Sequence, residues 1–239
     1  MLGLRNSLGI AKKRTATSGG GSFANAKSLS FDGTNDYAEA ADAAGVISGS
    51  TGTVSFWFKS SSLDGFFFEI KVDANNYLHA YYGSDVISIV RRAGGSNTSF
   101  TTFQDNSGND GNWHHLAITW SEAEDELISY KDGSAEVTRN ELSTWSGTPS
   151  IFTIGRYSHW AGGYLTGNID EFSVFSSALS ASDISDVYNS GAPTDLASTS
   201  GLVGYWRMEE GSGTSVADSS SNGNTATLVN GTAFDSDTP

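Results

Sequence analysis

The sequence predicts an all-β fold, and three observations point to it. Glycine, serine, threonine, asparagine and aromatic residues are abundant, as expected for many short strands joined by turns. Several runs alternate apolar and polar residues, which is the period of a strand with one face in a core. Helical spacing occurs in one segment, from Leu179 to Gly191. A chain of 239 residues is long enough for one large β domain or two small ones.

The charge of the chain is unevenly distributed. The formal net charge is −14, but the first fourteen residues contain Arg5, Lys12, Lys13 and Arg14 and no acid, so 9 of the 13 basic side chains and all 27 acidic ones follow. Such an acidic body would be repelled by nucleic acid and by anionic membrane surfaces, and it would suit cations. No apolar run approaches the roughly 18 to 20 residues that cross a bilayer, which argues against membrane insertion.

Residues 1–26 are predicted to form a basic N-terminal arm followed by a glycine- and serine-rich linker, TATSGGGSF. The alternative is a disordered tail. If the arm attaches the protein to a partner, its charges position it and its apolar side chains hold it. The predicted anchoring residues are therefore Met1, Leu2, Leu4, Arg5, Leu8, Lys12, Lys13 and Arg14.

From Lys27 onward, the chain is a succession of strand candidates separated by turns. In TVSFWFKSS (53–61), Val54, Phe56 and Phe58 fall on one side, as expected of a strand that contributes one face to a core. FFFEIKV, NYLHAYY and DVISIVRR are separated by DANN and GSD turns and predict a meander. The other candidates are KSLSFDGTNDYAEA (27–40), NWHHLAITW (112–120), LISYKDG (127–133), SIFTIGRYS (150–158) and GNIDEFSVF (167–175).

Two segments near the C-terminal end differ from this pattern. Leu179 to Gly191 predicts one short helix, with Ser180 as its N-cap, Asp183 as a capping-box acid and Gly191 as its stop. After a link, residues 202–234 contain two strand candidates around a polar loop, which is enough for a hairpin but too little for a separate domain. The hairpin is therefore expected to pack on the rest of the chain.

Six segments carry a further signal when they are taken in order: SLSFDGTNDY (28–37), TVSFWFK (53–59), NWHHLAITW (112–120), YKDG (130–133), FTIG (152–155) and GNIDEFSVFSSALSASDI (167–184). Together they resemble the concanavalin A-like jelly rolls of the laminin G type, in the lectin and glucanase superfamily. The resemblance implies two antiparallel sheets packed face to face, in a single jelly-roll domain over residues 27–239.

In relatives of this type, a segment similar to residues 202–234 usually precedes the FDG strand, whereas here it comes last. Because the ends of such sandwiches lie close together, the resemblance implies a permuted order in which the C-terminal hairpin completes its own sandwich. The alternative is a swapped homo-oligomer, in which the hairpin completes a neighbouring copy of the chain.

The short MLGLRNSL start, the single jelly roll and the end near FDSDTP also resemble virion-associated proteins of marine bacterial viruses. This resemblance implies a non-enzymatic structural protein of the virion surface, such as a capsid decoration or fibre protein, whose arm is anchored to other virion proteins. The alternative is a secreted or cell-surface module that binds cell-surface glycans with the help of calcium.

Asp170 and Glu171 stand side by side in an apolar strand candidate, so one of them must face inward, where a carboxylate needs a partner. The DGTND turn offers oxygen ligands of the kind that calcium prefers. The family resemblance implies that this turn neighbours the IDE strand and that a structural Ca²⁺ is held by Asp32, Asn35, Asp36 and Asp170. Glu171 is then expected to face outward without a special role. The alternative is a set of Asx hydrogen bonds within the turn.

Sugars are bound by exposed aromatic faces and a few directional polar groups. Five residues at strand ends or in loops are the predicted ligand-binding set: Tyr81, Tyr82, Tyr157, His159 and Trp160. Core packing is the alternative for any one of these rings.

The chain carries no motif that predicts catalysis. GxSxG, a P-loop and cysteine are absent. Glu122, Glu124 and Glu126 alternate, but they lie in the polar segment SEAEDE and are expected to form a solvated loop rather than the paired carboxylates of a glycosidase. The sequence therefore predicts a protein that is not an enzyme.

Overall fold

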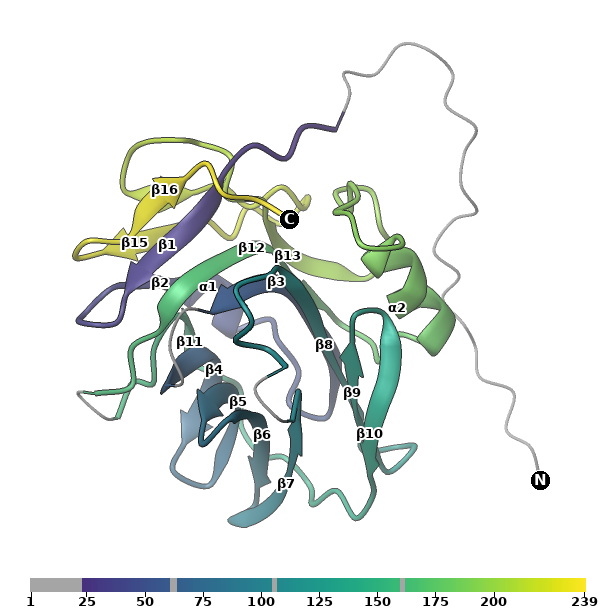
Figure 1. Ribbon diagram of the computed structural model, residues 1–239. Coiled ribbons are helices and arrows are strands. Elements are labelled where there is room, and N and C mark those ends of the chain that lie inside the picture. Colours follow the sequence, from purple (N-terminus) through teal and green to yellow (C-terminus); the bar gives the residue numbers. More distant parts are fainter. Residues whose placement is uncertain (1–22, 61–63, 105–106, 160–161) are drawn as a thin grey trace.

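The alternating runs of the sequence form two antiparallel sheets that pack face to face in the computed structural model (Figure 1). The structure describes residues 23–60, 64–104, 107–159 and 162–239. Within these ranges each sheet has eight strands, and strands from the edges of the two sheets, β7 and β10, contact each other. The predicted all-β sandwich is confirmed.

Sheet A is built around β12 (Thr166–Phe175), which pairs along most of its length with β3 (Thr51–Ser60). The other edge of β12 is shared, because β1 (Ser28–Asp32) pairs with its first half and β13 (Leu202–Trp206) with its second half. The sheet continues beyond β3 and β1 with β8 (His114–Ser121), β9 (Glu126–Lys131), β10 (Ser134–Arg139) and β16 (Ala233–Asp235).

Sheet B contains the three strands of the predicted meander, β4 to β6, and adds β7, which was not predicted, at the same side. Ser84 and Asp85, in the turn between β5 and β6, have φ values of 53° and 68°, as tight hairpin turns require. In spatial order the strands are β14 (Ser215–Val216), β15 (Ala226–Val229), β2 (Tyr37–Glu39), β11 (Ile151–Ile154), β4 (Asp64–Asp73), β5 (Asn76–Gly83), β6 (Val86–Ala93) and β7 (Ser96–Thr102).

The core lies between the sheets and follows the alternation of the sequence. Val54, Phe56 and Phe58 of β3 have no exposed surface, which confirms the predicted inner face. In β4 a bulge lies between Phe66 and Phe68. Phe67 and Phe68 both enter the core as a result, and Phe66 is left on the outer face of sheet B.

Helix α2 (Ala181–Tyr188) covers the outer face of sheet A, and its predicted start is confirmed. The Ser180 side chain accepts from the Asp183 N–H at 3.2 Å, and the Asp183 carboxylate accepts from the Ser180 N–H at 3.0 Å. The helix ends on Asn189, whose φ is 48°, two residues before the predicted stop at Gly191.

A second helix, α1 (Ala41–Ala44), was not predicted, because one turn is too short to show a helical period. In the described ranges, neither helix has the length and the apolar character that crossing a membrane requires. The prediction of one short helix is therefore incomplete.

The C-terminal segment completes both sheets of its own chain, and the expectation of a single hairpin is wrong. β13 pairs with β12 in sheet A, whereas β15 pairs with β2 in sheet B, so the two strand candidates of residues 202–234 lie in different sheets. β1 covers only the first half of β12, and β13 satisfies the backbone groups of the second half. β15 forms its hairpin with β14 instead.

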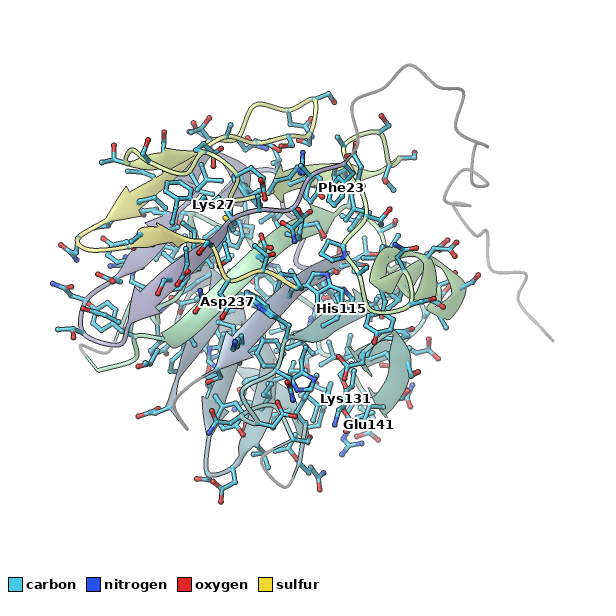
Figure 2. The ribbon with its side chains drawn as sticks, turned by 45° about the horizontal axis from the view of Figure 1, so that its top comes forward. Phe23, Lys27, His115, Lys131, Glu141 and Asp237 are labelled. Carbon is cyan, nitrogen blue, oxygen red and sulfur yellow. The ribbon has the colours of Figure 1, made fainter. Side chains whose placement is uncertain are left out.

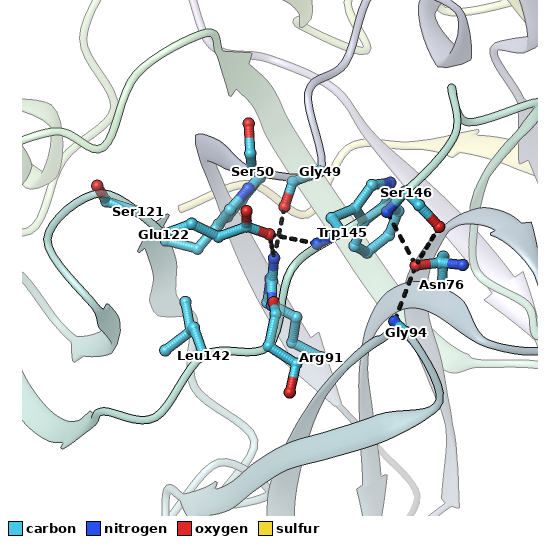
Figure 3. A network of polar contacts seen from close by, with 12 residues as sticks. Gly49, Ser50, Asn76, Arg91, Gly94, Ser121, Glu122, Leu142, Trp145 and Ser146 are labelled. Carbon is cyan, nitrogen blue, oxygen red and sulfur yellow. Dashed lines mark hydrogen bonds and ion pairs between the residues drawn. The ribbon is translucent and has the colours of Figure 1, made fainter.

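The loop between β10 and β11 is held across one end of the sandwich by a polar network (Figure 3). Arg91 donates to the carbonyl groups of Ser143 and Gly49, each at 2.9 Å, and forms an ion pair with Glu122. Glu122 Oε1 also accepts from the Trp145 N–H at 2.6 Å. Glu122 is therefore a structural residue, although the turn that follows it, residues 123–125, is exposed as expected from the sequence.

Candidate functional site

The outer face of sheet B brings together three of the predicted ligand-binding residues. Tyr81 lies on β5, while Tyr157 and His159 lie in the loop after β11; both tyrosines are half-buried and the histidine is exposed. Tyr82 is different, because successive strand residues point to opposite faces and its side chain lies in the core with no exposed surface. Its assignment to a surface site is wrong. Trp160 lies outside the described residues.

Strand pairing between β4 and β5 adds residues that the sequence reasoning missed. Residues two apart in a strand share a face, so Tyr77 and His79 lie in a row with Tyr81, a signal that NYLHAYY contained. Each member of the row stands opposite a residue of β4: Phe66 with Tyr81, Glu69 with His79, and Lys71 with Tyr77. We call the rings of Phe66, Tyr77, His79, Tyr81, Tyr157 and His159 the aromatic face.

Contacts among the rings make the aromatic face a fixed arrangement. The Phe66 ring stacks on Tyr81, with centroids 4.9 Å apart at 28°, and on Tyr157, with centroids 4.8 Å apart at 17°. His79 meets Phe66 edge-on at 5.1 Å and stacks on Tyr77 at 5.0 Å. Such pairs contribute about 0.5–1.5 kcal/mol each beyond their area burial.

Two buried charged side chains of β4 lie beneath the loop. Glu69 is 0% and Lys71 2% exposed, and Lys71 Nζ lies 3.6 Å from Glu69 Oε1. Glu69 Oε2 accepts from the Ser158 N–H at 2.8 Å, and Lys71 Nζ lies 2.7 Å from His159 Nδ1. The charges of β4 therefore hold the loop against the sheet.

Burial also sets the protonation of two rings of the aromatic face. Burial and, to a lesser extent, the charge of Lys71 lower the pKa of His79 to about 3, so this imidazole is neutral. Burial and the nearby Glu69 raise the pKa of Tyr157, so its phenol keeps its proton. His79 and Tyr157 therefore carry no charge at physiological pH.

Strands β6 and β7 continue the same surface with polar groups. Arg92 Nη1 donates to Asn97 Oδ1 at 3.2 Å. The outward residues of β6 pair with those of β7: Ser88 with Thr101, Val90 with Ser99, and Arg92 with Asn97. The outer face of sheet B thus has an aromatic part on β4, β5 and the loop after β11, next to a part on β6 and β7 that carries hydroxyl, amide and guanidinium groups. This combination can stack on the apolar face of a sugar ring and make directional hydrogen bonds to its hydroxyls.

Four oxygens of the DGTND turn accept hydrogen bonds within the protein. Asp36 is 2% exposed, and its two oxygens accept from the backbone N–H groups of Asp32, at 3.3 Å, and Gly231, at 2.7 Å. Asp32 Oδ1 accepts from the Thr34 N–H at 2.7 Å. The Asn35 carbonyl accepts from the side chain of Asn230. The bond between Thr34 and Asp32 is the Asx-type bond of the alternative interpretation, whereas Asn35 and Asp36 also join the turn to residues 230–231.

The structure does not bring Asp170 to this turn. β1 pairs Asp32 with Thr166, so Asp170 lies four residues, roughly 13 Å, further along β12. Among the described residues, no three His, Cys, Asp or Glu side chains gather in a way that could hold a metal ion. The residues present therefore do not fit a calcium ion shared by the turn and Asp170.

Asp170 and Glu171 are both buried, at 0% and 4% exposure, so the expectation that Glu171 faces outward is wrong. β12 bulges between Asp170 and Ser173, and Glu171 has a φ of 51°. Glu171 accepts from the Tyr205 hydroxyl. Burial raises the pKa of Glu171 to about 7, and burial together with the charge of Glu171 raises the pKa of Asp170 to about 9.

The chain before β1 is fastened near these acids. Figure 2 shows Phe23 and Lys27 on the segment that leads into β1. Arg207 packs over the Phe23 ring at 4.4 Å, and Glu209 Oε1 accepts from the Lys27 N–H at 3.1 Å. All the predicted anchoring residues, from Met1 to Arg14, lie outside the described residues.

Comparison with known proteins agrees with this architecture. Residues 32–185 match the model of the concanavalin A-like lectin/glucanases superfamily. Neuronal pentraxin-2 of Cavia porcellus is 22% identical over 149 residues, which cover 57% of this chain and 34% of the pentraxin.

Two solved structures share the fold. A "putative carbohydrate binding protein" from Bacteroides ovatus has a TM-score of 0.62 at 17% identity, covering 90% of this chain and 60% of that protein. The CBM40 of the Ruminococcus gnavus IT-sialidase, bound to α2,3-sialyllactose, has a TM-score of 0.58 at 13% identity, covering 67% of this chain and 96% of that structure.

This chain spans about a third of the length of the pentraxin and 60% of the length of the Bacteroides protein. The family match runs from the turn after β1 to α2, which is more than half of the chain, and it includes the strands that carry the aromatic face. The chain belongs to the concanavalin A-like lectin/glucanases superfamily.

Proposed function

We propose that this protein is a non-catalytic carbohydrate-binding protein and that the sugar lies on the aromatic face of sheet B. One observation carries this proposal: the exposed parts of Tyr77, Tyr81 and Tyr157 lie with the exposed His159 beside the polar surface of β6 and β7. Sugar rings have apolar faces that stack on aromatic rings and hydroxyls that need directional partners.

The relatives support a carbohydrate ligand in general terms. The Bacteroides structure is named for carbohydrate binding, and the Ruminococcus module holds α2,3-sialyllactose. Both share the fold with this chain at low identity, so neither names the sugar bound here.

The burial of the acidic residue of this face also favours sugar binding over sugar hydrolysis. A glycosidase needs two carboxylates on either side of the scissile bond, but Glu69, at the centre of the face, has no exposed surface and faces Lys71. The hydrogen-bonded pair of Ser55 and His115, 2.8 Å apart, is likewise closed to substrates, at 1% and 0% exposure.

A glycan array probed with the full chain tests the proposal, followed by calorimetry on the sugars that bind. Tyr81→Ala and Tyr157→Ala are each expected to weaken binding about tenfold, which corresponds to about 1.4 kcal/mol. Tyr188→Ala is the matched control. Tyr188 is also half-buried and stacks on a buried ring, that of Trp57, with centroids 5.5 Å apart, but it lies at the end of α2, over sheet A rather than sheet B. A silent array, or equal affinities for Tyr157→Ala and Tyr188→Ala, would contradict the proposal.

We further propose that the protein works at the surface of a virion, where residues 1–14 attach it to other virion proteins. The alternative location is an extracellular or cell surface. The charge asymmetry of the sequence supports this role, because a basic start precedes a strongly acidic remainder. A variant lacking residues 1–22 is expected to keep sugar binding and to lose attachment to particles. Normal decoration of particles by this variant would defeat the idea.

A further inference from the structure

Two side chains of β4 hold the tip of the loop that follows β11. Lys71 Nζ lies 2.7 Å from His159 Nδ1 and 3.6 Å from Glu69 Oε1, and Glu69 Oε2 accepts from the Ser158 N–H at 2.8 Å. Lys71 is 2% exposed and Glu69 is 0% exposed, so neither can contact a sugar itself. They can affect sugar binding only through the loop residues that they hold, Ser158 and His159.

The contact between Lys71 and His159 determines which ring nitrogen carries the proton. An ammonium group donates hydrogen bonds and accepts none, so Nδ1 of His159 must be the acceptor. Ser158 Oγ, 3.1 Å from the same nitrogen, can donate to it as well. The proton of the neutral ring is therefore on Nε2, the nitrogen that does not face Lys71.

His159 is an exposed residue of the aromatic face and lies next to Tyr157. The centroids of His159 and Tyr157 are 6.1 Å apart, and Lys71 Nζ lies 5.5 Å from the centre of the Tyr157 ring. One ligand can therefore contact both rings while the ammonium group remains covered. A donor with a fixed direction beside a stacking ring restricts what the ligand can place at that point.

We propose that Lys71 is a positioning residue that fixes His159 as a hydrogen-bond donor, so that the site selects neutral or acidic sugars and rejects amino sugars with a free ammonium group. The selection rests on the proposed sugar-binding function. An acceptor oxygen satisfies the Nε2–H, whereas an ammonium group presents a second donor and leaves that N–H without an acceptor. This preference runs against the net charge of −14, which would attract cationic sugars to the protein as a whole.

The tautomer is measured first, on the full chain and without any ligand. Two-bond ¹H–¹⁵N spectra, recorded above about pH 8 where imidazole is neutral, report the protonated nitrogen of each of the four histidines. His159→Gln assigns the signal. The expected result is an Nε2–H ring in the wild type and in Lys71→Arg. A wild-type His159 with its proton on Nδ1 would overturn the inference.

A variant that loses the charged pair shows whether Lys71 is the cause. Lys71→Met alone leaves the buried Glu69 without its counter-charge. The double variant Glu69→Met with Lys71→Met is therefore used, because apolar replacement of a whole buried pair keeps the fold stable. In this variant His159 is expected to populate both tautomers. A ring that stays entirely Nε2–H would overturn the role of Lys71.

Binding is measured on chitin oligomers and on the same oligomers after removal of the acetyl groups, together with the sugars found on the array. The wild type is expected to bind its array sugars about tenfold more tightly than the double variant does, because the double variant loses about one hydrogen bond to the sugar. The wild type is also expected to bind acetylated oligomers more tightly than de-acetylated ones. Equal affinities for wild type and double variant, or a preference for the de-acetylated oligomers, would overturn the inference. A silent array would overturn the proposed function and this selectivity with it, while the tautomer would still report the contact with Lys71.

Discussion

Replacing Glu69 by methionine is expected to lower the free energy of unfolding by about 3–5 kcal/mol. Glu69 is 0% exposed and Lys71 2%, with Nζ 3.6 Å from Oε1. The substitution leaves a buried ammonium group beside His159 Nδ1 and the Tyr157 ring without its counter-charge, and it removes the acceptor of the Ser158 N–H. The loss comes from groups that stay buried without their partners, and much less from the attraction of the pair itself.

The double variant Glu69→Met with Lys71→Met separates these two contributions. Both desolvation penalties disappear with the charges, so the double variant is expected to lie within about 1–2 kcal/mol of the wild type. The losses in unfolding free energy of the two single variants are then expected to sum to more than the loss of the double variant. The difference, which is the coupling energy of the two residues, should be at least about 2 kcal/mol. Urea unfolding followed by tryptophan fluorescence measures all four proteins, provided that the slope with urea stays constant.

The exposed ion pair of Lys59 and Asp237 provides the control. Its atoms are closer, at 2.7 Å, but its side chains are 30% and 43% exposed, so Lys59→Met is expected to cost less than about 1 kcal/mol. An equally small loss for Glu69→Met would show that water reaches the pair beneath the loop, and additive single variants would show that the two charges do not depend on each other. Either result would refute the reasoning.

Three further outcomes are expected. Ser180→Ala, which removes the N-cap of α2, should lower the free energy of unfolding by about 1 kcal/mol, while the exposed Ser182→Ala changes it little; thermal unfolding compares them. Hydrogen bonds that His114 donates to Asp132 and, to a lesser extent, to Asp110 raise the pKa of His114. Its contribution to stability is therefore complete below the unfolded pKa of about 6.5 and is lost as the pH rises through the folded pKa. His114→Gln should flatten the pH dependence of the free energy of unfolding in that range, and an unchanged dependence would contradict the ion pair. Asp36→Ala should lower the free energy of unfolding by about 1–3 kcal/mol, by the same amount in calcium and in chelator, because both carboxylate oxygens accept hydrogen bonds from backbone N–H groups. If calcium raised the melting temperature of the wild type but not that of Asp36→Ala, a calcium site at Asp36 would be supported instead.

The strands of this fold follow from the sequence because their period is local. Val54, Phe56 and Phe58 alternate in the chain and lie together in the core. The same holds for the start of α2, where Ser180 and Asp183 cap the helix through bonds between residues three apart. Such features need no knowledge of distant segments.

The candidate site was only partly accessible to this reasoning. Tyr157 and His159 could be selected as candidates because an aromatic loop is visible in the sequence, and alternation alone could have excluded Tyr82 and added Tyr77. Lys71 was missed, because in isolation it is an ordinary polar residue of a strand. Its role arises from a loop that lies about ninety residues further along the chain.

By itself the sequence determined an all-β chain with a capped helix, because local periodicity and capping specify these elements. The jelly-roll arrangement of the strands was expected from the resemblance of six segments to a known family. Only the tertiary structure decided which side chains the sheets cover. Bulges in β4 and β12 interrupt the alternation, so that Phe66 lies outside the core and Glu171 does not face the solvent. The loop after β11 then buries Glu69 and Lys71 on an outer face, because a strand's pattern does not show what packs over it.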